Sequence, residues 1–277
     1  MSVKTLISLL LCAAGVPLIA QPNVTAWNIL TEGLHADRPE HRRQAVTAIA
    51  SVGLTPESVH ALEDALRNDK DADVRQTAAA ELGILKSRQS IPALKDALDD
   101  PSEEVQFTAA KSLWEMDDHT GEEELGQVLT GEAKMAPGLV GGAMKDAKAK
   151  LHSPRTLAMM GVKEASGVFL GPASIGIVAA EEAMKDKGAP GRVVAASTLA
   201  QACDARVIQL FEFMLDNEKN WAVKAAVARG IGRCGSKDDI PRLEQHLSES
   251  RHAVKFMAAG AIVRLSLEKP VVASANP

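Results

Sequence analysis

Two short motifs in this 277-residue chain have spacings that other proteins use for chemistry. Segment 230–235 reads GIGRCG and matches the G-x-G-x-x-G pattern, which holds a dinucleotide phosphate between a strand and the start of a helix. Here the motif closes an alanine-rich helical stretch, so we predict no phosphate site. Ser266 and Lys269 match S-x-x-K, but no K-T-G partner accompanies them, and we interpret this match as chance.

Two acidic segments contain oxygen ligands that a cation would need. Segment 69–73 (DKDAD) begins like a calcium loop, but Val74 and Ala80 stand where that loop requires Gly and Glu. Segment 117–124 (DDHTGEEE) is denser and lacks a coordination pattern, so at most it predicts weak cation binding. The seven histidines show no H-E-x-x-H or paired ligand spacing. We therefore predict no metal, no cofactor and no catalytic residues.

The elements that would position these residues are helical repeats. Segment 74–79 (VRQTAA) returns 31 residues later as 105–110 (VQFTAA), and segment 223–228 (VKAAVA) returns 31 residues later as 254–259 (VKFMAA). A fixed period between about 20 and 50 residues indicates a repeat array. Each unit contains two stretches with apolar residues three and four apart, which predict two helices. We therefore predict an all-α fold, an α-α superhelix in which each unit is stabilised by its neighbours.

The pattern divides the chain into five parts. Repeats occupy residues 24–130 and 173–267, an irregular helical insert occupies 131–172, and residues 268–277 form a disordered tail. Residues 1–20 carry one positive charge and a short apolar run, which is typical of a secretory signal peptide. The alternative is an N-terminal anchor that stays attached. We expect an exported protein, periplasmic or extracellular.

Composition excludes several classes of partner. The net charge is −5 and no run of five like charges occurs, so the sequence offers no general attraction for nucleic acid or anionic lipid. Aromatic residues make up 3% and Tyr is absent, which disfavours a large aromatic cofactor pocket. Segment 165–180 has no charge, so membrane insertion is an alternative. Its short length and Pro172 favour an irregular buried unit instead.

Two cysteines, Cys203 and Cys234, remain after removal of the signal segment. Both lie near the ends of the second helices of neighbouring units. Such helices pack about 8–10 Å apart, whereas a disulfide needs Cα atoms closer than about 7 Å. We therefore predict two buried free thiols, although an oxidising compartment would favour a bridge.

Segment 73–83 (DVRQTAAAELG), preceded by LEDAL at 62–66, resembles the HEAT repeat, in the short bacterial form also found in phycobilisome-lyase-like proteins. The resemblance covers roughly 24–130 and 173–267. It implies a right-handed HEAT-type solenoid in which the second helix of each unit lines a concave face. It also implies a ladder of loop Asp and helix Arg residues between units, and the residues of matching type are Asp73, Arg75, Lys224 and Lys255.

The resemblance does not bring an enzymatic activity with it. Some relatives hydroxylate deoxyhypusine with a di-iron centre held by His-Glu pairs, and this sequence contains no His-Glu dipeptide. A bilin site is equally unsupported, because the resemblance is to the repeat alone. An oxidoreductase or lyase-type enzyme therefore stays an alternative rather than the preferred function.

Residues two and six positions after the repeat Val should face the concave side of such a solenoid. Phe107 and Phe256 would then be exposed aromatics, and Arg43, Lys111 and Arg229 would add positive charge. Aromatic and Arg side chains commonly anchor interfaces. A register error of one residue would instead bury both Phe residues. We predict a scaffold that binds a protein or peptide on this face without catalysis; the sequence predicts no oligomeric state.

Overall fold

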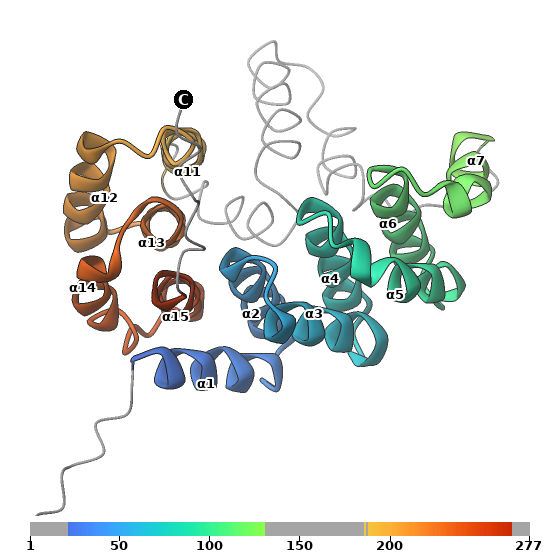
Figure 1. Ribbon diagram of the computed structural model, residues 1–277, viewed down its shortest axis with the longest axis horizontal. Coiled ribbons are helices and arrows are strands. Elements are labelled where there is room, and N and C mark those ends of the chain that lie inside the picture. Colours follow the sequence, from blue (N-terminus) through green and yellow to red (C-terminus); the bar gives the residue numbers. More distant parts are fainter. Residues whose placement is uncertain (1–21, 131–185, 187, 268–277) are drawn as a thin grey trace, which may run out of the picture.

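The computed structural model describes residues 22–130, 186 and 188–267 (Figure 1). Within these ranges every regular element is a helix. The α-helices are α1 (Pro22–Leu34), α2 (Pro39–Val52), α3 (Pro56–Asn68), α4 (Ala72–Ile84), α5 (Ile91–Asp96), α6 (Glu103–Trp114), α7 (Glu122–Thr130), α11 (Ala189–Leu199), α12 (Ala205–Asn217), α13 (Trp221–Cys234), α14 (Ile240–Glu244) and α15 (His252–Ser266). Short 3-10 turns η1 (Arg88–Ser90), η2 (Ala97–Asp99), η3 (His119–Gly121) and η4 (Lys237–Asp239) join several of them.

The helices begin where local chemistry satisfies their free amide groups. Thr55 caps α3 and forms a capping box with Ser58, and Pro56 occupies the first helical position. The Asp71 carboxylate caps α4 by accepting bonds from the amides of Asp73 and Val74. The predicted helix pair of this unit is therefore confirmed.

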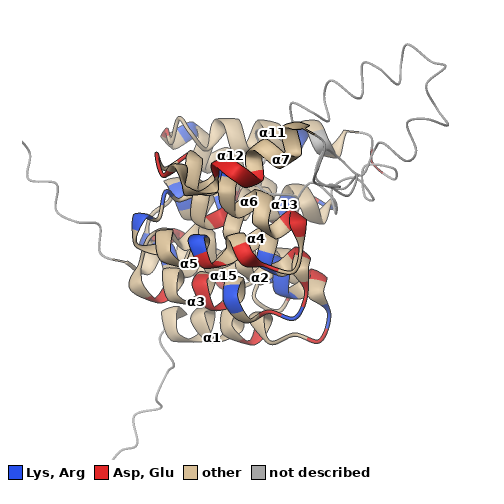
Figure 2. Ribbon diagram, turned by 90° about the vertical axis from the view of Figure 1, so that its right-hand side faces the viewer, with Lys and Arg blue, Asp and Glu red and all other residues tan. Residues whose placement is uncertain are grey.

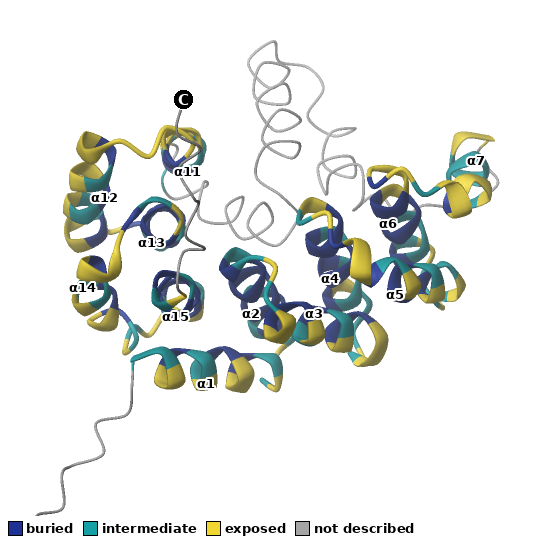
Figure 3. Ribbon diagram, in the orientation of Figure 1, coloured by how far each residue is buried: buried dark blue, intermediate teal, exposed yellow. Residues whose placement is uncertain are grey.

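Two layers of helices form an arc (Figure 1). The outer helices are α12, α14, α1, α3 and α5, and the inner helices are α11, α13, α15, α2, α4 and α6. Their facing sides are buried, whereas exposed residues gather on the outer helices and the connecting loops (Figure 3). The predicted all-α solenoid is confirmed over the described residues.

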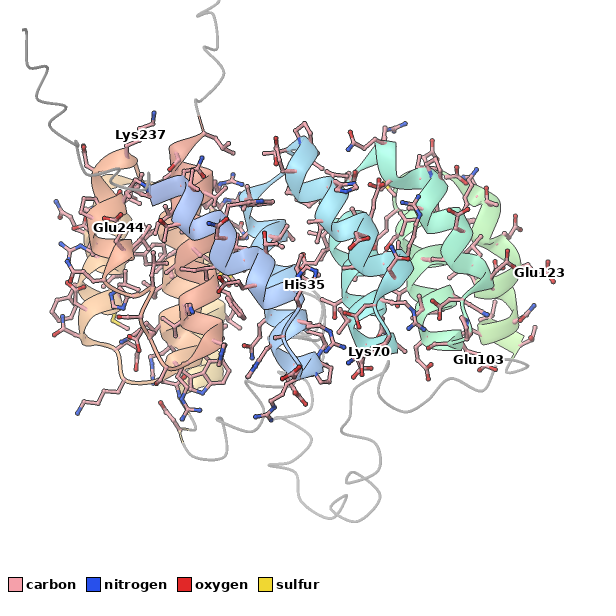
Figure 4. The ribbon with its side chains drawn as sticks, turned by 90° about the horizontal axis from the view of Figure 1, so that it is seen from below. His35, Lys70, Glu103, Glu123, Lys237 and Glu244 are labelled. Atoms are coloured by element: carbon pink, nitrogen blue, oxygen red, sulfur yellow. A yellow bond between two sulfur atoms is a disulfide. The ribbon has the colours of Figure 1, made fainter. Side chains whose placement is uncertain are left out.

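The units do not stack in the order of the sequence. Helix α15, the last of the described helices, packs against α1 and α2, the first two described. The inner helices therefore follow one another as α11, α13, α15, α2, α4 and α6. In the view of Figure 4, Lys237 and Glu244 of the repeat formed by α14 and α15 lie on one side of His35, which follows α1, and Glu123 of α7 lies on the other side. Both described ends of the chain thus lie inside the array.

We call the contact of α15 with α1 and α2 the seam. It depends on two glycines that allow close approach. A Cβ on Gly260 would lie 2.5 Å from the Ala48 carbonyl oxygen, and a Cβ on Gly33 would lie 2.8 Å from the Phe256 ring. Arg264 donates from Nη1 to the carbonyl oxygens of Ser51 and Val52, at 3.2 and 3.1 Å. The end of α2 is therefore capped by a residue from the last helix of the chain.

The G-x-G-x-x-G motif has a packing role in α13. A Cβ on Gly230 would lie 2.5 Å from the Phe211 ring of α12, and one on Gly232 would lie 2.7 Å from Ala261 of α15. Gly235 follows the last residue of the helix. Gly230 and Gly232 let α13 approach its neighbours closely.

The prediction of two free thiols is wrong, because Cys203 and Cys234 form a disulfide with their Cα atoms 4.9 Å apart. The predicted separation used the distance between helix axes. Cys203 instead lies beyond the end of α11, in a turn with a φ of 51°, outside the helix. This turn carries its Cα toward α13, to well within the range of a disulfide.

Several predicted segments lie outside the described residues. They are the signal segment 1–20, the insert 131–172, the uncharged segment 165–180 and the tail 268–277. Helix α7 ends at Thr130 and α11 begins at Ala189, on either side of the insert. None of the described helices combines the length and apolar character needed to cross a membrane.

Candidate binding face

A charge ladder joins neighbouring units along one edge of the inner helices. Its rungs link Arg42 to Asp69, Arg75 to Asp100, Arg192 to Glu218 and Lys224 to Glu249. The Arg75 rung uses two nitrogens, with Nε 2.7 Å from Oδ2 and Nη2 2.8 Å from Oδ1 of Asp100. Burial opposes ionisation of Asp100, but hydrogen bonds from Arg75 and the Ser102 amide outweigh it and lower its pKa.

The acid of the ladder differs from the one that the resemblance implies. Arg75 pairs with Asp100, whereas Asp73 lies 3.4 Å from Arg43 of the preceding inner helix. The ladder acids stand five residues before the repeat Val, as Asp69 stands before Val74. A loop position, rather than the first turn of the helix, therefore supplies each acid.

The seam lacks its rung. Lys255 occupies the ladder position of α15, but Ala36 stands where the next unit would supply an acid, and the described residues hold no ion pair to Lys255. Instead the rings of His41 and His252 stack at the seam, with centroids 3.8 Å apart. Burial lowers the pKa of both histidines, and nearby positive charge, including Arg38, lowers them further.

Two of the predicted concave residues are buried. Phe256 is 3% exposed and packs against Gly33 of α1, so the prediction that it is an exposed anchor is wrong. Arg43 is 8% exposed and directs Nη1 toward Asp73. Helix α1 covers Phe256 at the seam, whereas Arg43 is directed toward α4 on the other side of α2.

The other three predicted residues keep an accessible surface. Phe107 on α6 is partly exposed, and Lys111 one turn later is exposed and pairs with Glu115 of its own helix. Arg229 on α13 is partly exposed and lies far along the arc from α6. The structure therefore brings Phe107 and Lys111 together, and separates them from Arg229.

Arg229 belongs to a group that sequence reasoning missed. Arg233 lies one turn further along α13, and Arg264 occupies the position 31 residues later on α15. We call these three residues the concave arginine cluster. The repeat register could have found it, because Arg233 and Arg264 are equivalent positions in neighbouring units. Acidic and basic residues are interspersed elsewhere along the array (Figure 2).

A buried carboxyl group faces this cluster from α4. Glu81 is 1% exposed, and its Oε1 has no hydrogen-bond partner among the described residues. Burial raises the pKa of Glu81 to about 7, against the opposing effects of the Arg229 charge and of a hydrogen bond with Thr47. Burial, together with the charges of Arg233 and Arg229, lowers the pKa of Arg264. The inner face here thus combines crowded positive charge with a carboxyl group that titrates near neutrality.

No metal-binding arrangement occurs among the described residues, since no group of three or more His, Cys, Asp or Glu side chains could hold an ion there. The carboxylates of segment 69–73 have structural partners instead. Asp69 pairs with Arg42, and Asp71 caps α4.

The repeat geometry matches a known family. The HEAT repeat profile matches residues 27–114, 60–134 and 178–269, which together span more than half of the sequence. The chain therefore belongs to the HEAT repeat family. No match was found among curated proteins.

Two solved structures give distant similarity. Human deoxyhypusine hydroxylase in complex with glycerol is 17% identical with a TM-score of 0.33, and the match covers 88% of this chain and 96% of that one. The complex of CpcE and CpcF of phycocyanin lyase from Nostoc sp. PCC7120 is 19% identical with a TM-score of 0.33, covering 95% and 100%. Similarity at this level carries no inference about activity.

Proposed function

We propose that this protein is an exported scaffold that binds a protein or peptide along the inner, concave face of its helix array. One observation supports this most directly. The charges on the ladder edge are paired between units, whereas the inner face carries the partly exposed Phe107 and the concave arginine cluster. Accessible aromatic and Arg side chains on a rigid surface are the usual anchors of a protein interface.

Export is supported by the disulfide. Cys203 and Cys234 are bonded, and disulfides persist mainly in oxidising compartments. We expect the mature protein purified from its host to begin near residue 21 and to contain no free thiol. Intact mass spectrometry and thiol labelling of the unreduced protein measure both. A chain that retains Met1 and labels at two cysteines would contradict export.

The concave face is tested by affinity capture with residues 21–277 from the envelope extract of the host. We expect a captured protein to be lost with Phe107→Ala and kept with Phe213→Ala. Phe213 is the matched control, because it is 61% exposed on the outer helix α12. Crosslinks from the captured protein should map to α4 and α6.

Loss with Phe213→Ala but not with Phe107→Ala would place the partner on the outer layer and overturn the proposal. A purified protein that carries a bound metal or chromophore and turns over a substrate would favour the enzymatic alternative. Neither variant should alter the helical content, which circular dichroism checks.

A further inference from the structure

The concave arginine cluster is assembled by close helix packing. Helices α13 and α15 approach so closely that a Cβ on Gly232 would lie 2.7 Å from Ala261. Arg233 follows this contact directly, and Arg264 lies one turn after Ala261 on the facing helix. Because Arg229 precedes Arg233 by one turn, the two share one face of α13. Three guanidinium groups are therefore brought to one region of the inner face.

A glycine on α15, Gly260, opens the path from the arginine cluster on α13 to α2 and α4. Gly260 occupies on α15 the position that Arg229 occupies on α13 and Thr47 occupies on α2. Without a side chain there, α13 contacts α2 directly, although α15 lies between them in the stack. Arg229 thus comes near enough to Glu81 on α4 for its charge to act on that carboxyl group.

The cluster differs from the basic residues of the charge ladder in having few partners. No ion pair within 4.0 Å involves Arg229 or Arg233 among the described residues, whereas the basic residues of the four ladder rungs are all paired. Arg264 uses Nη1 to cap α2. Guanidinium groups held close together without an ion-paired carboxylate favour an anion that bridges them.

Resting on the proposed function, we propose that Arg229, Arg233 and Arg264 form a subsite for the clustered carboxylates of an acidic peptide segment of the partner. Arg side chains bind carboxylates with two parallel hydrogen bonds. A nucleic acid fits less well, because the chain carries a net charge of −5 and would repel a long polyanion outside this small region.

Glu81 should modulate this subsite. Below its pKa of about 7 it is neutral, and above that pH its carboxylate attracts Arg229 and competes with the peptide. Replacing Glu81 by Gln removes the competing charge and keeps the shape. The variant should therefore bind an acidic peptide more tightly at pH 8 and equally well at pH 6.

The experiment measures fluorescence anisotropy of a labelled octapeptide rich in Glu, with the matching Gln peptide as the neutral probe. We expect the full-length mature protein to bind the Glu peptide in low salt and to lose at least tenfold in affinity with Arg229→Gln/Arg233→Gln. Arg206→Gln, which removes an exposed arginine from the outer helix α12, should change nothing. Arg264 is left intact, because its loss would also uncap α2.

Three results would overturn the inference. The first is equal affinity for the Glu and Gln peptides. The second is a loss of Glu-peptide affinity in Arg206→Gln as large as that in Arg229→Gln/Arg233→Gln. The third is arginine-dependent binding of an eight-nucleotide thymidine oligomer that is tighter than binding of the Glu peptide. An unchanged affinity of Glu81→Gln at pH 8 would remove Glu81 from the subsite. If capture of the partner depends on Phe107 but the Glu peptide does not bind, the arginine subsite is wrong and the proposed function stands. If the partner binds to the outer helices, the proposed function itself is wrong.

Discussion

The seam and the junction between α4 and α6 join the same kinds of helices by different means. Between α4 and α6, Arg75 and Asp100 form a two-pronged ion pair, and Ser112 donates to the Ala79 carbonyl oxygen. At the seam no charged rung exists, and Gly260, Phe256 and the His41–His252 stack fill the contact. Equivalent faces of the repeats thus hold together with a charged rung between α4 and α6, and without one at the seam.

The difference follows from one loop position. Each ladder acid sits in the loop between the two helices of a unit and pairs with the base on the inner helix of the neighbouring unit. At the seam the corresponding loop, between α1 and α2, has Ala36 at that position. At the seam, close packing of α15 against α1 and α2 therefore stabilises the junction without a ladder ion pair.

Truncation of the seam aromatic should have the largest effect. Phe256→Ala is expected to lower the free energy of unfolding by about 3–5 kcal/mol, because it empties a buried site between α15 and α1. Phe107→Ala, at the partly exposed equivalent position, should cost about 1 kcal/mol or less. Urea denaturation measures both; equal losses would show that the seam is no more closely packed than α6.

Loss of a ladder rung should come second. Arg75→Ala is expected to cost about 2–4 kcal/mol, because it leaves the largely buried Asp100 carboxylate without its partner. Lys255→Ala is the matched change at the seam and should stay within about 0.5 kcal/mol. As the pH falls through the lowered pKa of Asp100, the wild type should lose free energy of unfolding, because protonation of Asp100 breaks its ion pair with Arg75. The Arg75 variant lacks this ion pair, so its stability should fall less over the same pH range.

The glycine of the seam gives a smaller and more local test. Gly260→Ala should cost about 1–3 kcal/mol, because the added methyl group would press on the backbone carbonyl of Ala48. Gly126→Ala on α7 is the control, since a Cβ there meets nothing within 4 Å. That control should gain up to about 1 kcal/mol from helix propensity. A stabilised Gly260→Ala protein would mean that α15 and α2 do not approach this closely.

The smallest effect is expected from building the missing rung. Ala36→Asp should pair with Lys255 and raise the free energy of unfolding by less than about 1 kcal/mol, as an accessible ion pair does. A double-mutant cycle with Lys255→Ala isolates the pair. A coupling energy of zero would show that the seam does not follow the register of the ladder.

Sequence reasoning recovers the parts of this fold that depend on neighbours in the chain. The VRQTAA segment and its return 31 residues later define helix pairs, because apolar periodicity acts within one unit. The stacking order is not encoded there, since every inner helix presents similar small residues to either neighbour. Nothing in the repeat pattern indicates that the last unit packs against the first.

The same reasoning explains what was missed at the candidate site. Phe107 and Phe256 occupy equivalent positions, but only the seam places α1 over the second. The cysteine pair depends on a left-handed turn at Cys203 that helix periodicity does not describe. Arg229 was found from its position in the repeat, whereas Glu81 becomes part of the site only once α13 and α4 are placed in space.

The seam also determines when folding can finish. In most solenoids each unit contacts its sequence neighbours, so structure can nucleate anywhere and spread. Here Arg264 must reach a carbonyl group 213 residues earlier in the chain. Contacts between distant residues slow folding, because a long loop must close before they form. A nascent chain would therefore carry α1 and α2 with one face uncovered until α15 has been synthesised, and a chaperone would encounter that partly assembled form.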